Sequence, residues 1–148
     1  MRCAPARRAA LVPAAGLVLA LAPPAAGGDG PVAPVRVAVT GGAFTGSVGI
    51  VRTAARSLYG GFRCAADGVR PTPLTALADA DRRYHLGVRA HWDEAAGDFV
   101  VTEIHGDAAD GGRKWHAYVN EEKITTGPCG TAVKDHDKVR WTLEAATS

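Results

Sequence analysis

The chain has 148 residues, of which 47% are hydrophobic and 22% are charged, a composition that suits one domain with a modest core. Its 17 Lys and Arg residues outnumber its 15 Asp and Glu residues, but Arg2, Arg7 and Arg8 lie in the N-terminal segment, and without them 14 basic residues face 15 acidic ones. The rest of the chain is therefore close to neutral and has no basic run, which excludes the electrostatic footprint of a nucleic-acid-binding protein.

The N-terminal segment has the three parts of a secretory signal peptide. The arginines precede an apolar run over residues 9–22, and small residues follow it. We predict a signal peptide over residues 1–27, cleaved after Ala26 or Gly27, and a Gly/Pro-rich linker over 28–34. The apolar run is interrupted by Pro13 and is too short to span a bilayer, so we expect a secreted protein without a membrane anchor after cleavage.

A single domain is predicted over residues 35–148, and alternation marks its first strands. Val35, Val37 and Val39 alternate with polar or small residues, which predicts a strand. A Gly-Gly turn at 41–42 leads to a second strand over 44–52. The pattern then fades over 53–70, where we expect irregular chain.

One helix is predicted after this irregular segment. Thr72 suits the N-cap and Pro73 the first helical position. Leu74 and Leu77 fall on one face of the helix, which suits packing against a sheet. We expect the helix to end by about Arg83.

Four more strands are predicted downstream of the helix. They cover residues 84–90 with an end near Trp92, then 99–104, 115–119 and 139–143, and a polar loop occupies 106–113. The order of two strands, a helix and further strands predicts an α+β fold that is β-grasp-like, a mixed curved sheet of short strands with one helix packed on it. A small β-sandwich with an incidental helix is the alternative.

Two cysteines, Cys64 and Cys129, remain once Cys3 leaves with the signal peptide. In an oxidising exterior the default is one disulfide, which would close a loop of about 65 residues. A lone reactive thiol and a metal site are the alternatives. The metal site lacks a paired CxxC or a recognised zinc spacing among the five histidines, so we expect no metal ligands and no cofactor.

Trp92, Tyr118 and Asn120 are the candidate ligand-binding residues. Trp92 borders a predicted turn and Tyr118 lies on the face opposite Trp115, so both aromatic rings are available for contact with a ligand or partner. Trp115 itself is expected in the core. Asn120, the one Asn of the chain, either accepts the left-handed conformation of a tight turn or contacts a ligand.

Catalytic motifs are missing from this sequence. Ser47 lies in a predicted strand without a following helix, unlike a nucleophile elbow. The glycine-rich run over 41–49 lacks the Lys of a phosphate-binding loop. We therefore expect a protein that is not an enzyme and that has no catalytic residues.

The chain resembles the DUF4430 family of secreted bacterial proteins, which is related to the C-terminal β-domain of transcobalamin and intrinsic factor. The resemblance is carried by blocks that cover nearly the whole predicted domain, namely TPLTALADA at 72–80, FVVTEIHG at 99–106, WHAYVN at 115–120 and VKDHDKVRW at 133–141. The family usually has Gly where His136 stands here and often has Gly where Glu121 stands, so the His136 turn must either avoid a positive φ or accept strain.

The resemblance implies a β-grasp-like extracellular domain that binds without catalysis. Transcobalamin's version helps to cover a corrinoid, so the leading hypothesis is a secreted binding module for a small molecule of corrinoid type. The alternative is an extracellular or cell-surface module that contacts a protein partner. Neither hypothesis involves nucleic acid or a membrane.

Overall fold

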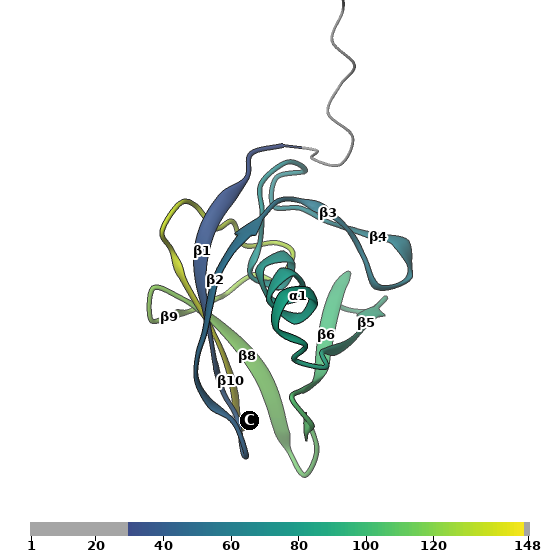
Figure 1. The fold of residues 1–148 in the computed structure, drawn as a ribbon. Helices are drawn as coiled ribbons and strands as arrows, with labels where there is room; N and C mark the ends of the chain where they lie inside the picture. The colour runs from purple at the N-terminus through teal and green to yellow at the C-terminus, as the bar shows by residue number, and fades with distance from the viewer. Residues whose placement is uncertain (1–29, 147–148) are drawn as a thin grey trace, which may run out of the picture.

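A five-stranded mixed sheet forms one side of the protein (Figure 1). The computed structural model describes residues 30–146. Strand β1 pairs in parallel with β10, and all other neighbours in this sheet are antiparallel. The strand order is β2 (Thr45–Thr53), β1 (Ala33–Thr40), β10 (Lys138–Ala145), β8 (Arg113–Val119) and β9 (Glu122–Lys123).

The alternating sequence of β1 and β10 explains why these strands lie at the centre of the sheet. Val35, Val37 and Val39 are buried on one face, and Val139 and Trp141 lie beside them. The intervening residues face away from the core, as period-two patterning requires. Both predicted strands are confirmed, although β1 begins two residues before the boundary that the sequence suggested.

Helix α1 (Pro73–Tyr84) packs on the buried face of this sheet. The Thr72 hydroxyl accepts the N–H of Thr75 and the Thr75 hydroxyl accepts the N–H of Thr72, which is a reciprocal capping box. Leu74 and Leu77 are fully buried. The predicted cap is confirmed, and the helix runs one residue further than expected.

A second, antiparallel sheet lies across the helix from the first (Figure 1). Its core residues belong to the same buried cluster as those of α1 and β1. Its strands are β5 (Arg89–Asp93), β6 (Asp98–Ile104) and β7 (Asp107–Ala108). A separate short hairpin consists of β3 (Arg56–Leu58) and β4 (Phe62–Cys64), and the 3-10 turn that joins them, η1 (Tyr59–Gly61), contacts β5. The described residues thus form mostly β-sheet with one α-helix, an α+β arrangement.

Three local expectations were wrong. The strand predicted to start at Tyr84 starts at Arg89 instead, because α1 continues to Tyr84 and His85 takes a left-handed conformation at the C-cap. Leu86 is buried, but its carbonyl accepts the N–H of His105 in a loop contact. The segments predicted as irregular around Cys64 and as a loop after Gly106 contain the β3–β4 hairpin and β7.

The predicted signal peptide and the first two residues of the predicted linker lie outside the described residues, whereas residues 30–34 of the linker are described and its last two residues belong to β1. Within residues 30–146, no helix is long and apolar enough to cross a membrane.

Candidate functional site

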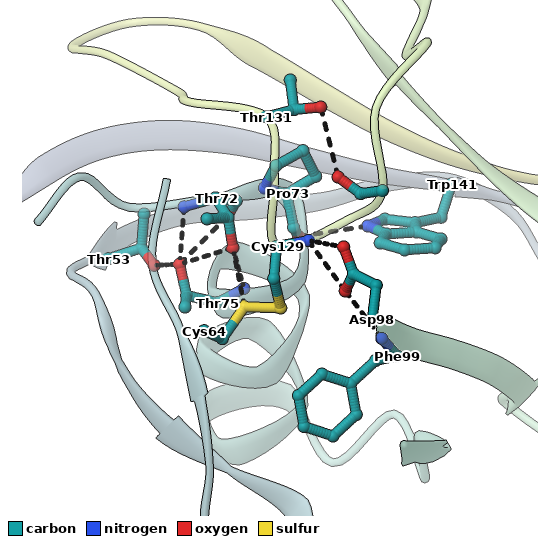
Figure 2. Close-up of a disulfide and its surroundings, with 11 residues drawn as sticks. Thr53, Cys64, Thr72, Pro73, Thr75, Asp98, Phe99, Cys129, Thr131 and Trp141 are labelled. Carbon is teal, nitrogen blue, oxygen red and sulfur yellow. Dashed lines mark hydrogen bonds between the residues drawn. A yellow bond between two sulfur atoms is a disulfide. The ribbon is translucent and has the colours of Figure 1, made fainter. Parts of the chain in front are cut away.

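The disulfide between Cys64 and Cys129 joins the end of β4 to the loop that precedes β10 (Figure 2). The two Cα atoms are 4.9 Å apart across 65 residues of sequence. The Thr72 hydroxyl lies 3.1 Å from Cys64 Sγ and donates to it, because a disulfide sulfur carries no proton. The predicted pairing is confirmed, and it fastens both segments to the N-terminus of α1.

Asp98 is a buried carboxylate beside the disulfide (Figure 2). Its oxygens accept the N–H of Cys129 at 3.1 and 3.2 Å and the N–H of Phe99 at 2.6 Å. Burial raises the pKa of Asp98 above its usual range, and these backbone hydrogen bonds oppose the rise. A side chain at Gly127 would overlap this carboxylate. The arrangement holds the Cys129 loop against β6.

A groove of about 410 Å³ lies between β6 and β8. Phe99, Trp115 and Trp141 contribute to its lining, and all three residues are almost fully buried. Apolar side chains complete much of the remaining wall, from Val100, Val101, Ala109, Ala117, Ile124 and Pro128. The sequence analysis placed Trp115 in the core and missed the groove beside it.

The walls of this groove are strand edges. Consecutive residues line it, 99–102 on β6 and 113–117 on β8, whereas a sheet face would contribute alternate residues only. On β8, the short strand β9 pairs with Tyr118 and Val119 only. On β6, the strand β7 pairs with Glu103 and Ile104 only. The groove therefore runs along edge segments that have no strand partner among residues 30–146.

The charges of the groove have one sign. Arg113 and Lys114 are exposed in its lining, and its described lining contains no carboxylate. Arg113 pairs with Asp110 at 2.7 Å in the adjoining loop. Burial, followed by the charge of Lys123, lowers the pKa of His116, and its buried Nε2 has no hydrogen-bond partner in the described structure.

Trp92 lies on the far side of β6 from the groove, within an aromatic cluster. Its ring stacks on Phe62 with centroids 4.6 Å apart and contacts Phe99 edge-on at 5.3 Å. Phe62 is 38% exposed, so the cluster reaches the surface. Trp92 does not line the β6–β8 groove.

Tyr118 and Asn120 lie near each other but away from Trp92. The Tyr118 hydroxyl donates to Glu144 at 2.9 Å, which raises the pKa of Tyr118, and the Arg140 guanidinium lies 4.4 Å from the ring centroid. Asn120 has a φ of +50°; its amide donates to Asp137 at 2.9 Å and its oxygen accepts the N–H of Lys138. Both ends of the Asn120 amide are thus engaged, and the turn explanation accounts for this residue.

Asn120 also borders a separate hollow of about 650 Å³ near β9. Neither Tyr118 nor Asn120 lines the β6–β8 groove. The three predicted ligand-binding residues are therefore not brought together, and their role in binding stays a prediction. Within residues 30–146, no three His, Cys, Asp or Glu side chains gather in a way that could hold a metal ion.

Comparisons with known proteins give likeness at the level of the fold. No family model matches the chain, so the DUF4430 resemblance stays a prediction, and no curated protein matches. Sixteen chains of solved structures match. One is haptocorrin in complex with Cbi, with 13% identity and a TM-score of 0.55, over 79% of this chain and 26% of haptocorrin.

Another similar structure is a provisionally assigned metal-binding protein from Ruminococcus gnavus, with 18% identity and a TM-score of 0.49. The alignment covers 78% of this chain and 99% of that one. This chain thus spans about a quarter of haptocorrin's length and shares its fold over that part.

Proposed function

We propose that this protein is a secreted, non-catalytic binding module and that its ligand occupies the β6–β8 groove. The observation that carries the proposal is the composition of the groove wall. Aromatic and aliphatic side chains line a concavity of about 410 Å³, and two exposed cations stand in the same wall. Binding sites combine an apolar wall with a few oriented polar groups in this way.

The β-grasp architecture is part of the proposal. The order β2-β1-β10-β8, with the parallel pair β1 and β10 at the centre and α1 following β2 and the β3–β4 hairpin, supports it. In this architecture the sheet and helix form a rigid support, and the β5–β6–β7 sheet supplies the second wall of the groove.

The disulfide and the groove chemistry support the remaining parts of the proposal. A disulfide that ties the domain together favours an oxidising compartment, in agreement with the export signal predicted at the N-terminus. His116 is the one side chain of the groove suited to general base catalysis. Burial and nearby lysines lower its pKa, and its Nε2 lies 3.9 Å from a Glu144 oxygen, too far for a hydrogen bond, with no nucleophile bonded to it in the described structure.

The first candidate occupant is a small molecule of corrinoid type. The fold likeness to haptocorrin, a structure in complex with Cbi, supports this candidate. A corrinoid is larger than the groove, so the groove would hold one edge of the molecule and a second protein surface would cover the remainder.

The second candidate occupant is a segment of an extracellular protein partner. The unpaired edges of β6 and β8 favour it, because exposed strand edges are ready templates for pairing. The two candidates use the same groove and are separated by experiment.

The test of the groove is thermal melting of the secreted protein with corrinoids, other cofactors and candidate peptides. A ligand at 100 times its dissociation constant stabilises the folded state by about 2.7 kcal/mol. Val100→Glu places a carboxylate in the groove wall, and Ile50→Glu is its control, since Ile50 is an exposed strand residue on the five-stranded sheet.

We expect a bound ligand to raise the melting temperature of the wild type and Ile50→Glu equally, and to have little effect on Val100→Glu. An unchanged shift in Val100→Glu would move the binding site elsewhere, first to the surfaces of Trp92 and Tyr118.

A further inference from the structure

We propose that the groove receives an extended, acidic segment of a partner protein, which adds as a strand between β6 and β8. This inference rests on the proposed function, in which the groove is the binding site. It goes further by naming the class of occupant from the atoms that line the groove.

The backbone of β8 carries the first step. Residues Arg113–Val119 pair with β10 in an unbroken register. The Ala117 carbonyl accepts the N–H of Ile124, so Ala117 directs its backbone groups away from β10. Backbone groups of alternate residues point to the same edge of a strand. The N–H and C=O of Trp115 therefore point toward the groove as well, together with the N–H of Ala117.

These backbone groups have no partner within residues 30–146. Trp115 is 7% exposed and Ala117 is 2% exposed. Buried backbone donors and acceptors are nearly always paired in folded proteins. An extended segment supplies donors and acceptors with the spacing that this edge requires, which a small apolar molecule does not.

The opposite wall provides the second edge. Strand β6 pairs with β5 along its length, but β7 reaches only Glu103 and Ile104, and the N–H of Ala109 reaches Thr102. The part of β6 before Thr102 faces the groove without a strand beside it. A segment seated there would join the three-stranded sheet to the five-stranded sheet.

The side chains of the groove specify the chemistry of the segment. Phe99 and Trp115 form an apolar floor, which suits apolar side chains at alternate positions. Arg113, which pairs with Asp110, and Lys114 lie in the wall. Among the described residues, Lys114 has no ion pair and no carboxylate lines the groove. Charge complementarity therefore favours Asp or Glu at the flanks of the segment.

The length of the open edge sets the size of the contact. Residues 113–116 have no strand partner on the groove side, and four residues of a strand extend for roughly 13 Å. We therefore expect the occupant to pair over about four residues.

The experiment selects binders from a random library of seven-residue linear peptides displayed on phage, with the secreted, oxidised protein as the target. Enriched peptides are synthesised and titrated into ¹⁵N-labelled protein. We expect peptides with acidic flanks and alternating apolar residues. Hydrogen exchange at the amides of Trp115 and Ala117 should slow on saturation, because these amides gain partners.

Charge reversal provides the matched variants. Lys114→Glu should weaken binding about tenfold or more, whereas Lys138→Glu, on β10 and outside the groove, should leave it unchanged. An enriched peptide methylated at its alternate backbone nitrogens should lose binding, because it cannot complete the ladder.

Four outcomes would overturn the inference. The acidic strand would be ruled out if no peptide is enriched. It would also be ruled out if the enriched peptides bind Lys114→Glu as tightly as the wild type and do not slow hydrogen exchange at the Trp115 and Ala117 amides. A dimer whose Trp115 and Ala117 amides are protected without peptide would assign the edge to a second copy of the chain. If a small molecule shifts the melting temperature and Val100→Glu abolishes the shift, the proposed function stands while this inference fails.

Discussion

The carboxylate of Asp98, at the start of β6, accepts the backbone N–H of Cys129, a residue 31 positions later in the chain. Both Asp98 oxygens participate, and the N–H of Phe99 is a second donor. This contact holds the disulfide loop beside one end of the groove, because Phe99 and Pro128 both line it. The described hydrogen-bond partners of this buried carboxylate are backbone N–H groups. The free energy of unfolding should therefore change both when the carboxylate is replaced and when the pH is varied.

The first prediction concerns Asp98. Asp98→Ala leaves the N–H of Cys129 without its partner, and we expect the free energy of unfolding to fall by about 1–3 kcal/mol at neutral pH. Asp98→Asn keeps one acceptor oxygen and removes the buried charge, so its loss should be smaller. Urea unfolding of both variants and the wild type gives this comparison.

Comparison of the wild type with Asp98→Asn also tests the raised pKa of Asp98. Because burial raises the folded-state pKa above the unfolded value, the contribution of this group to stability is fully present below the unfolded pKa and is lost as pH rises through the folded pKa. Asp98→Asn should remove this decline, which begins as the pH rises past the unfolded pKa and is complete above the raised folded pKa. Equal pH profiles for the wild type and Asp98→Asn would contradict the assignment.

Alternation and capping made much of this fold predictable from the sequence. Val35, Val37 and Val39 mark a strand with one buried face, and Thr72-Pro73 marks the helix start, because both signals are local. The segment from Tyr84 misled the same reasoning. Leu86 and Val88 are both buried and are two residues apart, which is the spacing of buried residues in a strand. They lie in a loop that packs on the core, so the same sequence pattern arose without a strand.

The groove was not predictable because it depends on pairing that is absent. Trp115 was correctly expected in the core. The sequence around it does not indicate that pairing between β8 and β9 ends at Tyr118, so that the backbone N–H and C=O of Trp115 have no strand partner in the described structure. Trp92 is half-buried, as its place beside a turn suggested. Its stacking partner Phe62 was not predictable, because it lies thirty residues earlier in the chain and is brought to Trp92 by the β3–β4 hairpin. Local sequence patterns show which face of a strand is buried. The groove is formed by strand edges, which depend on how distant strands pair.

The second prediction concerns the disulfide. It closes a 65-residue separation, for which chain entropy gives roughly 4 kcal/mol as an upper estimate. The double variant Cys64→Ala/Cys129→Ala should lose about 2–4 kcal/mol in urea unfolding under oxidising conditions. Reductant should destabilise the wild type and leave the double variant unaffected. A loss below about 1 kcal/mol would mean that other contacts already restrict the loop.

The third prediction concerns the turn at His136. This exposed residue has a φ of +69°, a conformation that favours Gly, as the family resemblance suggested. His136→Gly should raise the free energy of unfolding by about 0.5 kcal/mol, the balance between relieved backbone strain and the greater freedom of Gly in the unfolded chain.

The neighbouring residue gives a control for that substitution. Asp135 is exposed and does not have a positive φ, so Asp135→Gly should lower stability by about 0.5–1 kcal/mol. Thermal melting of the two variants should shift in opposite directions. A decrease in both would show that the His136 side chain contributes more than its backbone strain costs.

The last prediction concerns Thr75, which connects the helix cap to β2. Its buried hydroxyl oxygen accepts the N–H of Thr72 at 2.9 Å and the hydroxyl of Thr53 at 2.8 Å. Thr75→Val keeps the shape and removes the acceptor, leaving both donors buried without a partner. We expect a loss of about 1–3 kcal/mol, whereas Thr75→Ser, which keeps the hydroxyl, should lose less. If Thr75→Ser is the more damaging change, packing of the methyl group and not the hydrogen bonds would account for most of the contribution of Thr75 to stability.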